Sequence, residues 1–375
     1  MSVYANLSLS RKIPGLVAIA ALLAVVAVGM ASYFLAASAL RHAADEKFTA
    51  LVQARHDALA SYLGSIREDA VAIAASGQVA DALAAYQQGW GELAGSGDAT
   101  AALQKLYIDT NPNPVGEKHK LDAAGDGSAY SAGHARFHPW FRQFLEARGY
   151  YDVFLISPAG EVVYTVFKER DFASNLEHGP GKDTGLAEVF RKARAGSAGT
   201  IAFSDFAAYA PSNGAPASFI ATPIVRDGQV LGVLAFQMPA GRINQMMQSS
   251  AGMGESGETY LIGADKLMRS DSRFAKEPTI LKTKVDTDTV KAALAGNNGF
   301  ADILDYRGVP VLSVYRPIDF EGVRWGIIGE IDEVEMMAPA RRLRNIATLI
   351  GAGILAVVVV VGVFVARGIS GPSSA

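Results

Sequence analysis

Two long runs without a charged residue, one near each end of the 375-residue chain, constrain its structure more than any other feature. The first covers 13–39 and is dominated by Ala, Val, Leu and Ile, and the second covers 346–366 and is rich in Val and Gly. A helix needs roughly 20 apolar residues to cross the hydrocarbon core of a bilayer, so both runs are long enough. We predict two transmembrane helices. The alternative, two buried helices of a soluble protein, would require protein to cover both runs.

Basic residues flank both runs: Arg11 and Lys12 precede the first, and Arg341, Arg342 and Arg344 precede the second. The residues beside the first span usually dominate orientation, and they favour a cytoplasmic N-terminus. We therefore expect 40–345 to be extracytoplasmic, in a multi-pass protein of the inner (plasma) membrane. This orientation obeys the positive-inside rule only in part, because three arginines lie on the outer side. A cleavable signal peptide would have a shorter apolar centre, roughly 7–15 residues, so we expect an uncleaved anchor.

Composition excludes several classes of function. Charged residues make up 19% of the chain and hydrophobic residues 50%, which fits a protein that lies partly in lipid. The formal net charge of −3 provides no basic surface for nucleic acid. Without cysteine, disulfides and thiolate metal sites are excluded. The six histidines have no metal-ligand spacing, and no phosphate-binding loop or nucleophile elbow occurs, so we expect no enzyme activity, no cofactor and no metal.

A long helix is predicted directly after the first span, over 38–75. It contains no proline, and Val52, Leu59, Ile66 and Ile73 recur at every seventh position. Such a seam either packs on the helix's own domain or forms a parallel contact in a homodimer, and the sequence favours neither. The following stretch, with Asn111-Pro112-Asn113-Pro114, predicts shorter helices and a loop.

From Tyr151 onward the pattern changes to short strand-like runs separated by turn residues. We predict a hairpin at 152–156 and 161–167, a helix at 184–195, and strands at 200–206, 217–225 and 230–237. The same order recurs more compactly, with a hairpin at 259–262 and 264–268, a helix at 289–294, and strands at 299–306, 309–317 and 324–331. A helix at about 240–250 links the two series.

This arrangement resembles the double Cache extracellular sensor of bacterial methyl-accepting chemotaxis proteins. The phrases that carry the resemblance are His138–Arg142, Gly149–Ser157, Val166–Asp171, Tyr209–Ile220, Gly257–Phe274 and Asp302–Arg307. The end of the chain, Arg367–Pro372, is similar to the opening of a HAMP linker. The resemblance implies that cytoplasmic HAMP and signalling regions are missing beyond the sequence.

The resemblance implies an α+β fold, in which two transmembrane helices flank a long N-terminal helix and two tandem PAS-like (Cache) antiparallel-sheet modules. In chain order we expect a cytoplasmic N-terminus 1–12, transmembrane helix 13–39, a helical segment 40–148, a membrane-distal Cache module 149–240, a membrane-proximal Cache module 241–336, a connecting helix 337–345, transmembrane helix 346–366 and a HAMP-like linker 367–375.

Some members of the family bind amino acids through an Arg-x-Trp-Tyr cluster between the second and third strands of the distal module. The corresponding interval here, 168–200, contains neither Trp nor Tyr. Trp140 lies before the first predicted strand and does not correspond to that cluster. No ligand identity therefore follows from the resemblance.

Polar residues around the distal sheet are the candidate ligand site. We select Tyr164, Lys168, Asp171, Asp205, Tyr209 and Ser218. Lys168 offers a cation to a carboxylate, and Asp205 an acceptor for an ammonium or hydroxyl group, a mix that suits a small polar metabolite. The alternative for 168–171 is a solvated charged loop. Asp205 lies between Phe203 and Phe206, where a carboxylate needs a partner.

Two further motifs have structural interpretations. His138-Pro139-Trp140-Phe141 predicts a helix start with Trp140 packed inward, although a ligand contact is the alternative. Arg269, Asp271 and Arg273 predict ion pairs rather than a second site.

The sequence thus predicts a chemoreceptor sensory region that binds a small ligand and signals across the membrane to cytoplasmic partners. The alternatives are the same sensor on a histidine kinase or nucleotide cyclase, and an anchored binding protein without signalling output. In the receptor hypothesis, ligand closure of the distal module changes contacts across a homodimer and displaces the helix that enters the second span.

Overall fold

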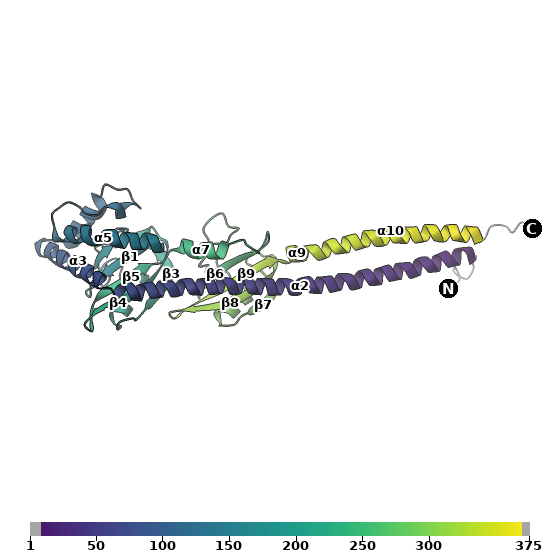
Figure 1. The fold of residues 1–375 in the computed structure, drawn as a ribbon, viewed down its shortest axis with the longest axis horizontal. Helices are drawn as coiled ribbons and strands as arrows, with labels where there is room; N and C mark the ends of the chain where they lie inside the picture. Colours follow the sequence, from purple (N-terminus) through teal and green to yellow (C-terminus); the bar gives the residue numbers. More distant parts are fainter. Residues whose placement is uncertain (1–8, 370–375) are drawn as a thin grey trace, which may run out of the picture.

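The computed structural model describes residues 9–369 and is dominated by one helix of 66 residues, α2 (Leu9–Ala74). At 1.5 Å per residue this helix is about 100 Å long. It runs along both sheets and lies beside α10 (Ala338–Ile369) toward the end of the molecule where both termini lie (Figure 1). The first predicted span and the long helix that follows it therefore form one continuous element.

The paired ends of α2 and α10 leave their apolar side chains exposed. Both helices are long and apolar enough to cross a membrane, and almost nothing in the most apolar stretch of either is buried by protein. Core helices of a soluble protein would be covered, so the structure argues against that alternative. Residues 1–8 of the predicted cytoplasmic N-terminus lie outside the described residues. Residues 370–375 of the predicted HAMP-like linker lie outside them as well.

A helical cap follows α2 and contains α3 (Gly77–Ser96), α4 (Ala99–Gln104), the π-helix η1 (Lys105–Asp109), the 3₁₀ turn η2 (Lys118–Lys120) and α5 (Ala129–Arg148). The predicted helix start at His138-Pro139 is wrong, because Pro139 lies inside α5. Ser128 provides the cap, since its hydroxyl accepts the amide of Ser131 at 3.1 Å. Trp140 packs inward as expected, with its ring stacked on Phe144.

The first sheet has five antiparallel strands in the order β2-β1-β5-β4-β3. The strands are β1 (Asp152–Ile156), β2 (Val162–Thr165), β3 (Ala202–Tyr209), β4 (Ala215–Arg226) and β5 (Gln229–Gln237). Helix α6 (Gly185–Arg194) packs on one face, while α2, α3 and α5 pack on the other. Because both faces are covered, β1 and β2 are buried at every residue and show no alternation of polar and apolar side chains.

The second sheet has four antiparallel strands in the order β6-β9-β8-β7. They are β6 (Glu258–Ile262), β7 (Gly299–Leu304), β8 (Pro310–Phe320) and β9 (Val323–Asp332), with α8 (Asp288–Leu294) on one face and α2 on the other. The predicted second strand of the hairpin is reduced to isolated bridges. The reason is that Leu267 pairs with Lys284 while Met268 pairs with Ile262, so the run has no single partner strand.

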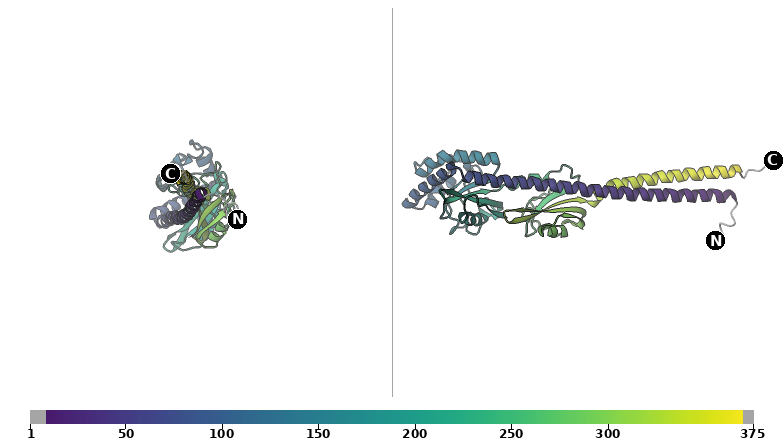
Figure 2. Two further views of the ribbon diagram at one scale, coloured as in Figure 1. Left: turned by 90° about the vertical axis from the view of Figure 1, so that its right-hand side faces the viewer. Right: turned by 60° about the horizontal axis from the view of Figure 1, so that its bottom comes forward.

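The two sheets lie end to end along α2 (Figure 2). Helix α7 (Ala240–Gln248) joins them, and the short α9 (Glu333–Met336) connects β9 to α10. Val52, Leu59 and Ile66 of the seven-residue seam are buried in the main core of the same chain. The structure therefore gives the own-domain interpretation of the seam, and these three residues are not available for contact with a second copy.

Candidate functional site

A cluster of buried polar side chains lies in the five-stranded sheet, where β1 and β5 meet the loop after β2. Its members are Asp152 on β1, Lys168 and Asp171 in the loop, Tyr209 at the end of β3 and Gln237 at the end of β5. Each is at most 4% exposed. We call these five residues the polar cluster. Burial of polar groups is costly unless each finds a partner, so the hydrogen bonds of the cluster determine what it can do.

Asp152 and Gln237 are directly opposite each other across β1 and β5. Asp152 Oδ1 accepts the amides of Val153 (2.7 Å), Val166 (2.8 Å) and Phe167 (3.1 Å), which ties the loop after β2 to β1. Asp152 Oδ2 and Gln237 Oε1 are buried without a hydrogen-bond partner among the described residues. The pair therefore presents two free acceptors.

Lys168 is held in the left-handed region, with φ +61°. Its amide donates to Thr165 Oγ1 at 3.0 Å, and its ammonium donates to the Thr165 carbonyl. Nζ lies 4.4 Å from the ring centroid of Tyr164 and 5.0 Å from that of Phe172, within cation–π range. A left-handed non-glycine residue costs about 1–3 kcal/mol and is kept only where surrounding contacts require it.

Asp171 completes the cluster from the other side of the loop. Its Oδ2 accepts the hydroxyl of Tyr209 at 2.7 Å, while Oδ1 is buried without a partner in the described chain. The solvated-loop interpretation is therefore wrong for Lys168 and Asp171, which are both buried; only Arg170 of the four residues is exposed.

Burial shifts the titration of all three ionisable groups toward their neutral forms. It lowers the pKa of Lys168 to about 7, against the attraction of the two carboxylates. It raises the pKa of Asp171 to about 7 and raises that of Asp152, which the charge of Asp171 raises further. The two carboxyl groups have one lysine near them, so full ionisation would leave one negative charge in excess.

An open hollow of about 570 Å³ adjoins the cluster, between the π-helix end of the cap and the loop after β2. Tyr151, Phe167, Lys168 and Glu169 contribute to its wall. Ser212 donates to Glu169 at 2.6 Å, and Gln237 Nε2 lies 3.3 Å from the Ser212 hydroxyl. A chain of hydrogen bonds thus connects the wall of the hollow to the buried cluster.

Tyr164 lies on the face of the sheet opposite to Asp152, among aromatic side chains of the cap. Its ring stacks on Tyr86 at 4.7 Å, and its hydroxyl lies 2.7 Å from Nδ1 of His138. Burial and the charge of Lys168 lower the pKa of His138 to about 2, so this imidazole is neutral. Tyr164 contacts the cluster through its ring, beneath the Lys168 ammonium.

The hydrogen-bond partners of Asp205 lie outside the polar cluster. Its carboxylate accepts Nε (2.9 Å) and Nη2 (2.8 Å) of Arg269 and Nε1 of Trp325 (2.8 Å). Because Asp205 is on β3, while Arg269 follows β6 and Trp325 is on β9, these bonds join the two sheets. We call these three residues the inter-sheet bridge. The Arg269 guanidinium is also paired with Asp265, at 2.9 Å.

The remaining candidates serve local structure. Ser218 donates to the carbonyl of Ser204 at 2.8 Å, between β4 and β3. Asp271 accepts from Asn244 at 2.8 Å, and Arg273 donates to the carbonyl of Gly257 at 2.6 Å. Of the three residues predicted to form ion pairs, Arg269 alone forms them among the described residues, and its two partners are Asp205 and Asp265 rather than Asp271.

Sequence reasoning missed Asp152 and Gln237. The available signal was a carboxylate at the first position of an otherwise apolar run, Asp152–Ile156, where it must be buried with the strand. Gln237 ends its strand in the same way. Among the described residues, no group of three or more His, Asp and Glu side chains is arranged to hold a metal ion.

Comparison with known families identifies the chain. The family model described as "Cache domain" matches residues 133–340, more than half of the sequence. The chain belongs to the Cache domain family, and the resemblance seen in the sequence is confirmed. No curated protein matches the chain.

Several solved structures are similar to the chain at low identity. One is the ligand-binding domain of the Pseudomonas fluorescens chemoreceptor CtaA in complex with L-isoleucine, with 16% identity over 68% of this chain and 90% of that one and a TM-score of 0.37. A second is "Methyl-accepting Chemotaxis protein X", with 16% identity, 78% and 99% coverage and a TM-score of 0.45. A third is the ligand-binding domain of PctC from Pseudomonas aeruginosa PAO1 in complex with GABA, with 18% identity, 68% and 97% coverage and a TM-score of 0.37.

Proposed function

We propose that the chain is the sensory region of a transmembrane receptor, and that its polar cluster binds a small polar ligand through a cationic amine. The observation that carries the proposal is a set of three buried acceptors that have no partner among the described residues, Asp152 Oδ2, Asp171 Oδ1 and Gln237 Oε1, in a cluster whose Lys168 lines an open hollow. Each unpaired buried acceptor costs about 1–3 kcal/mol, which a ligand with several N–H donors recovers.

The charge balance supports a cation rather than an anion. Without ligand, a proton neutralises the second carboxyl group, which agrees with the raised pKa values of Asp152 and Asp171. An ammonium group that enters from the hollow replaces this proton. The charge of Lys168 attracts the other carboxylate. A ligand carboxylate, where present, is left to cations on the wall of the hollow, such as Lys118.

We further propose that the two sheets act as a membrane-distal module (149–240) and a membrane-proximal module (241–336). The inter-sheet bridge supports this proposal, since it connects β3, next to the cluster, to β9, which leads through α9 to α10. Ligand closure then displaces α10 relative to α2, by a coupling of about 1–3 kcal/mol. The output is chemotaxis through cytoplasmic partners, from a homodimer in the inner membrane with its sensor outside.

A binding screen of the full chain in detergent tests the ligand class. We expect thermal shifts with amines or amino acids, but not with organic acids or purines that lack a cationic amine. Asp152→Asn and Asp171→Asn should each weaken a hit at least tenfold, because each removes a charge that faces the ammonium. Asp81→Asn is the matched control, since Asp81 is an exposed carboxylate paired with Arg226.

The pH dependence provides a second measurement on the same hit. Because the ligand cation replaces a proton on carboxyl groups whose pKa is raised, affinity should increase from pH 6 to pH 8, with proton release in titration calorimetry. Hits confined to organic acids, or hits unchanged in both Asn variants, would show that the cluster is not the site.

A further inference from the structure

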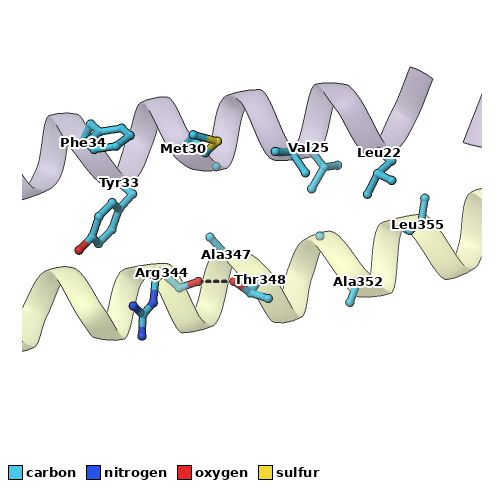
Figure 3. A pocket seen from close by; sticks show the side chains of 13 residues that line it. Leu22, Val25, Met30, Tyr33, Phe34, Arg344, Ala347, Thr348, Ala352 and Leu355 are labelled. Atoms are coloured by element: carbon cyan, nitrogen blue, oxygen red, sulfur yellow. Dashed lines mark hydrogen bonds between the residues drawn. The ribbon is translucent and has the colours of Figure 1, made fainter. Parts of the chain in front are cut away.

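The paired helices α2 and α10 enclose an apolar groove that the sensory function does not use. The groove has a volume of about 480 Å³. Leu22, Val25 and Met30 contribute to its wall from α2, and Ala347 and Leu355 from α10 (Figure 3). The helices meet closely at Gly351, where a Cβ atom would lie 2.5 Å from Val25 Cγ1, so the groove lies beside a real packing contact.

The length of the groove along the helices is close to the hydrocarbon thickness of one leaflet of a bilayer. Its wall extends from Leu22 to Phe34 on α2, which at 1.5 Å per residue is about 18 Å. The hydrocarbon core of a bilayer is about 30 Å thick, so one leaflet contributes about 15 Å. A partner helix would need a seam along the whole span, whereas an acyl chain of one leaflet needs only this length.

One end of the groove is polar and cationic. Arg344 lies there, and Tyr33 reaches toward it from α2 (Figure 3). Arg341 and Arg342 precede it by one turn of the same helix, and all three side chains are exposed. In the part of the chain that the structure describes, none of the three has a salt bridge; Arg344 donates to Asn345 Oδ1 at 3.2–3.3 Å. Three cations at a membrane surface without protein counter-charges require anions.

We propose that this groove binds one anionic phospholipid of the sensor-side leaflet, with an acyl chain between the helices and its phosphate on the Arg341–Arg344 cluster. The occupant follows from charge complementarity and from the one-leaflet depth. It also gives a role to the three arginines that the positive-inside rule disfavours at this end of the span. The lipid then lies against α10, the helix that leaves the four-stranded sheet.

Native mass spectrometry of the full chain tests this site. The protein is released from nanodiscs made of phosphatidylglycerol and phosphatidylethanolamine in equal amounts, and retained lipids are counted. We expect one phosphatidylglycerol in preference to phosphatidylethanolamine. Arg344→Gln should reduce that preference about fivefold, since one arginine near an anionic surface contributes about 1 kcal/mol. Arg67→Gln, an exposed arginine of α2 paired with Glu321, should retain it.

A second variant fills the groove instead of removing a charge. Gly29 lines the groove, and a Cβ atom there meets nothing within 4 Å, so Gly29→Leu introduces a side chain without a clash. It should reduce retention of both lipids. Gly353→Leu is the matched control, because Gly353 also has open space around it but does not line the groove.

Two results would overturn the proposal. One is lipid retention in Gly29→Leu equal to that of the unchanged chain. The other is efficient cross-linking between two copies through Gly29→Cys in the nanodisc, which would show that a second copy covers the groove. The chain has no cysteine of its own, so a single introduced thiol reports only this position.

Discussion

The two sheets bury acidic residues in different ways. In the five-stranded sheet, the ammonium of Lys168 attracts Asp152 and Asp171 at longer range, although it forms no salt bridge with either among the described residues. In the four-stranded sheet, Glu258 and Glu330 are directly opposite each other across β6 and β9, and neither is exposed. Within the described residues no lysine or arginine forms a salt bridge with either glutamate.

Hydroxyl groups replace the cation in the second case. Glu258 accepts Tyr306 at 2.8 Å and Ser272 at 2.7 Å, and Glu330 accepts Ser313 at 3.0 Å. Neutral donors do not compensate a second buried negative charge, and burial raises the pKa of Glu330 to about 8, so Glu330 holds a proton at neutral pH. The comparison teaches that a buried carboxylate is not by itself a ligand site. The polar cluster differs from the glutamate pair in its counter-charge and in the hollow beside it.

The largest expected effect comes from removal of the counter-charge in the first sheet. Lys168→Met leaves two buried carboxyl groups without a nearby cation, and we expect a loss of about 3–5 kcal/mol in the free energy of unfolding at pH 6, below the Lys168 pKa of about 7. Chemical unfolding followed by circular dichroism measures this loss. The double variant Lys168→Met/Asp152→Asn should recover much of it, because the excess negative charge is gone.

Lys192→Met is the control for this experiment, since Lys192 is exposed and forms a salt bridge with Glu188 on the same helix, and it should change stability by no more than about 0.5 kcal/mol. A Lys168→Met variant as stable as this control would remove the distinction between the two sheets.

A smaller effect is expected at the inter-sheet bridge. Asp205→Ala removes the acceptor of Arg269 and of the Trp325 indole, and leaves the buried guanidinium with the half-exposed Asp265. We expect a loss of about 2 kcal/mol and faster amide hydrogen exchange in both β3 and β9. Asp265→Ala, which removes only the more exposed partner, should cost less than about 1 kcal/mol. Equal effects of the two variants would mean that the bridge does not connect the sheets energetically.

Most of the architecture could be predicted from local patterns. The two uncharged runs, the proline-free stretch after the first and the strand-like runs of each sheet indicate their structures without long-range information. The helix start at His138-Pro139 was wrong because proline favours a first turn but does not require one, and Ser128 provides a better cap upstream.

The candidate site was harder to predict because it depends on register. Asp152 and Gln237 meet only because β1 pairs with β5 in one particular alignment, which neither strand specifies alone. The same applies to Asp205. Its position between Phe203 and Phe206 indicated that it needs a partner, but Arg269 and Trp325 come from the other sheet, and no local pattern identifies them.

The sharpest test of the comparison concerns pH in the four-stranded sheet. Burial, together with the nearby charges of Asp305 and Glu258, raises the pKa of Glu330 to about 8 against the hydrogen bond from Ser313. Because the folded pKa is above the unfolded value of about 4.3, this group contributes its full stability at low pH. The contribution is lost as pH rises toward 8, at about 1.4 kcal/mol per pH unit.

Glu330→Gln keeps the shape of the side chain but has no proton to lose, so its unfolding midpoint should not share this decline between pH 5 and pH 8. Asp302→Asn, which changes an exposed carboxylate on β7, should retain it. If the chain and Glu330→Gln lose stability in parallel over this range, the proton is not on the glutamate pair, and the contrast with the polar cluster fails.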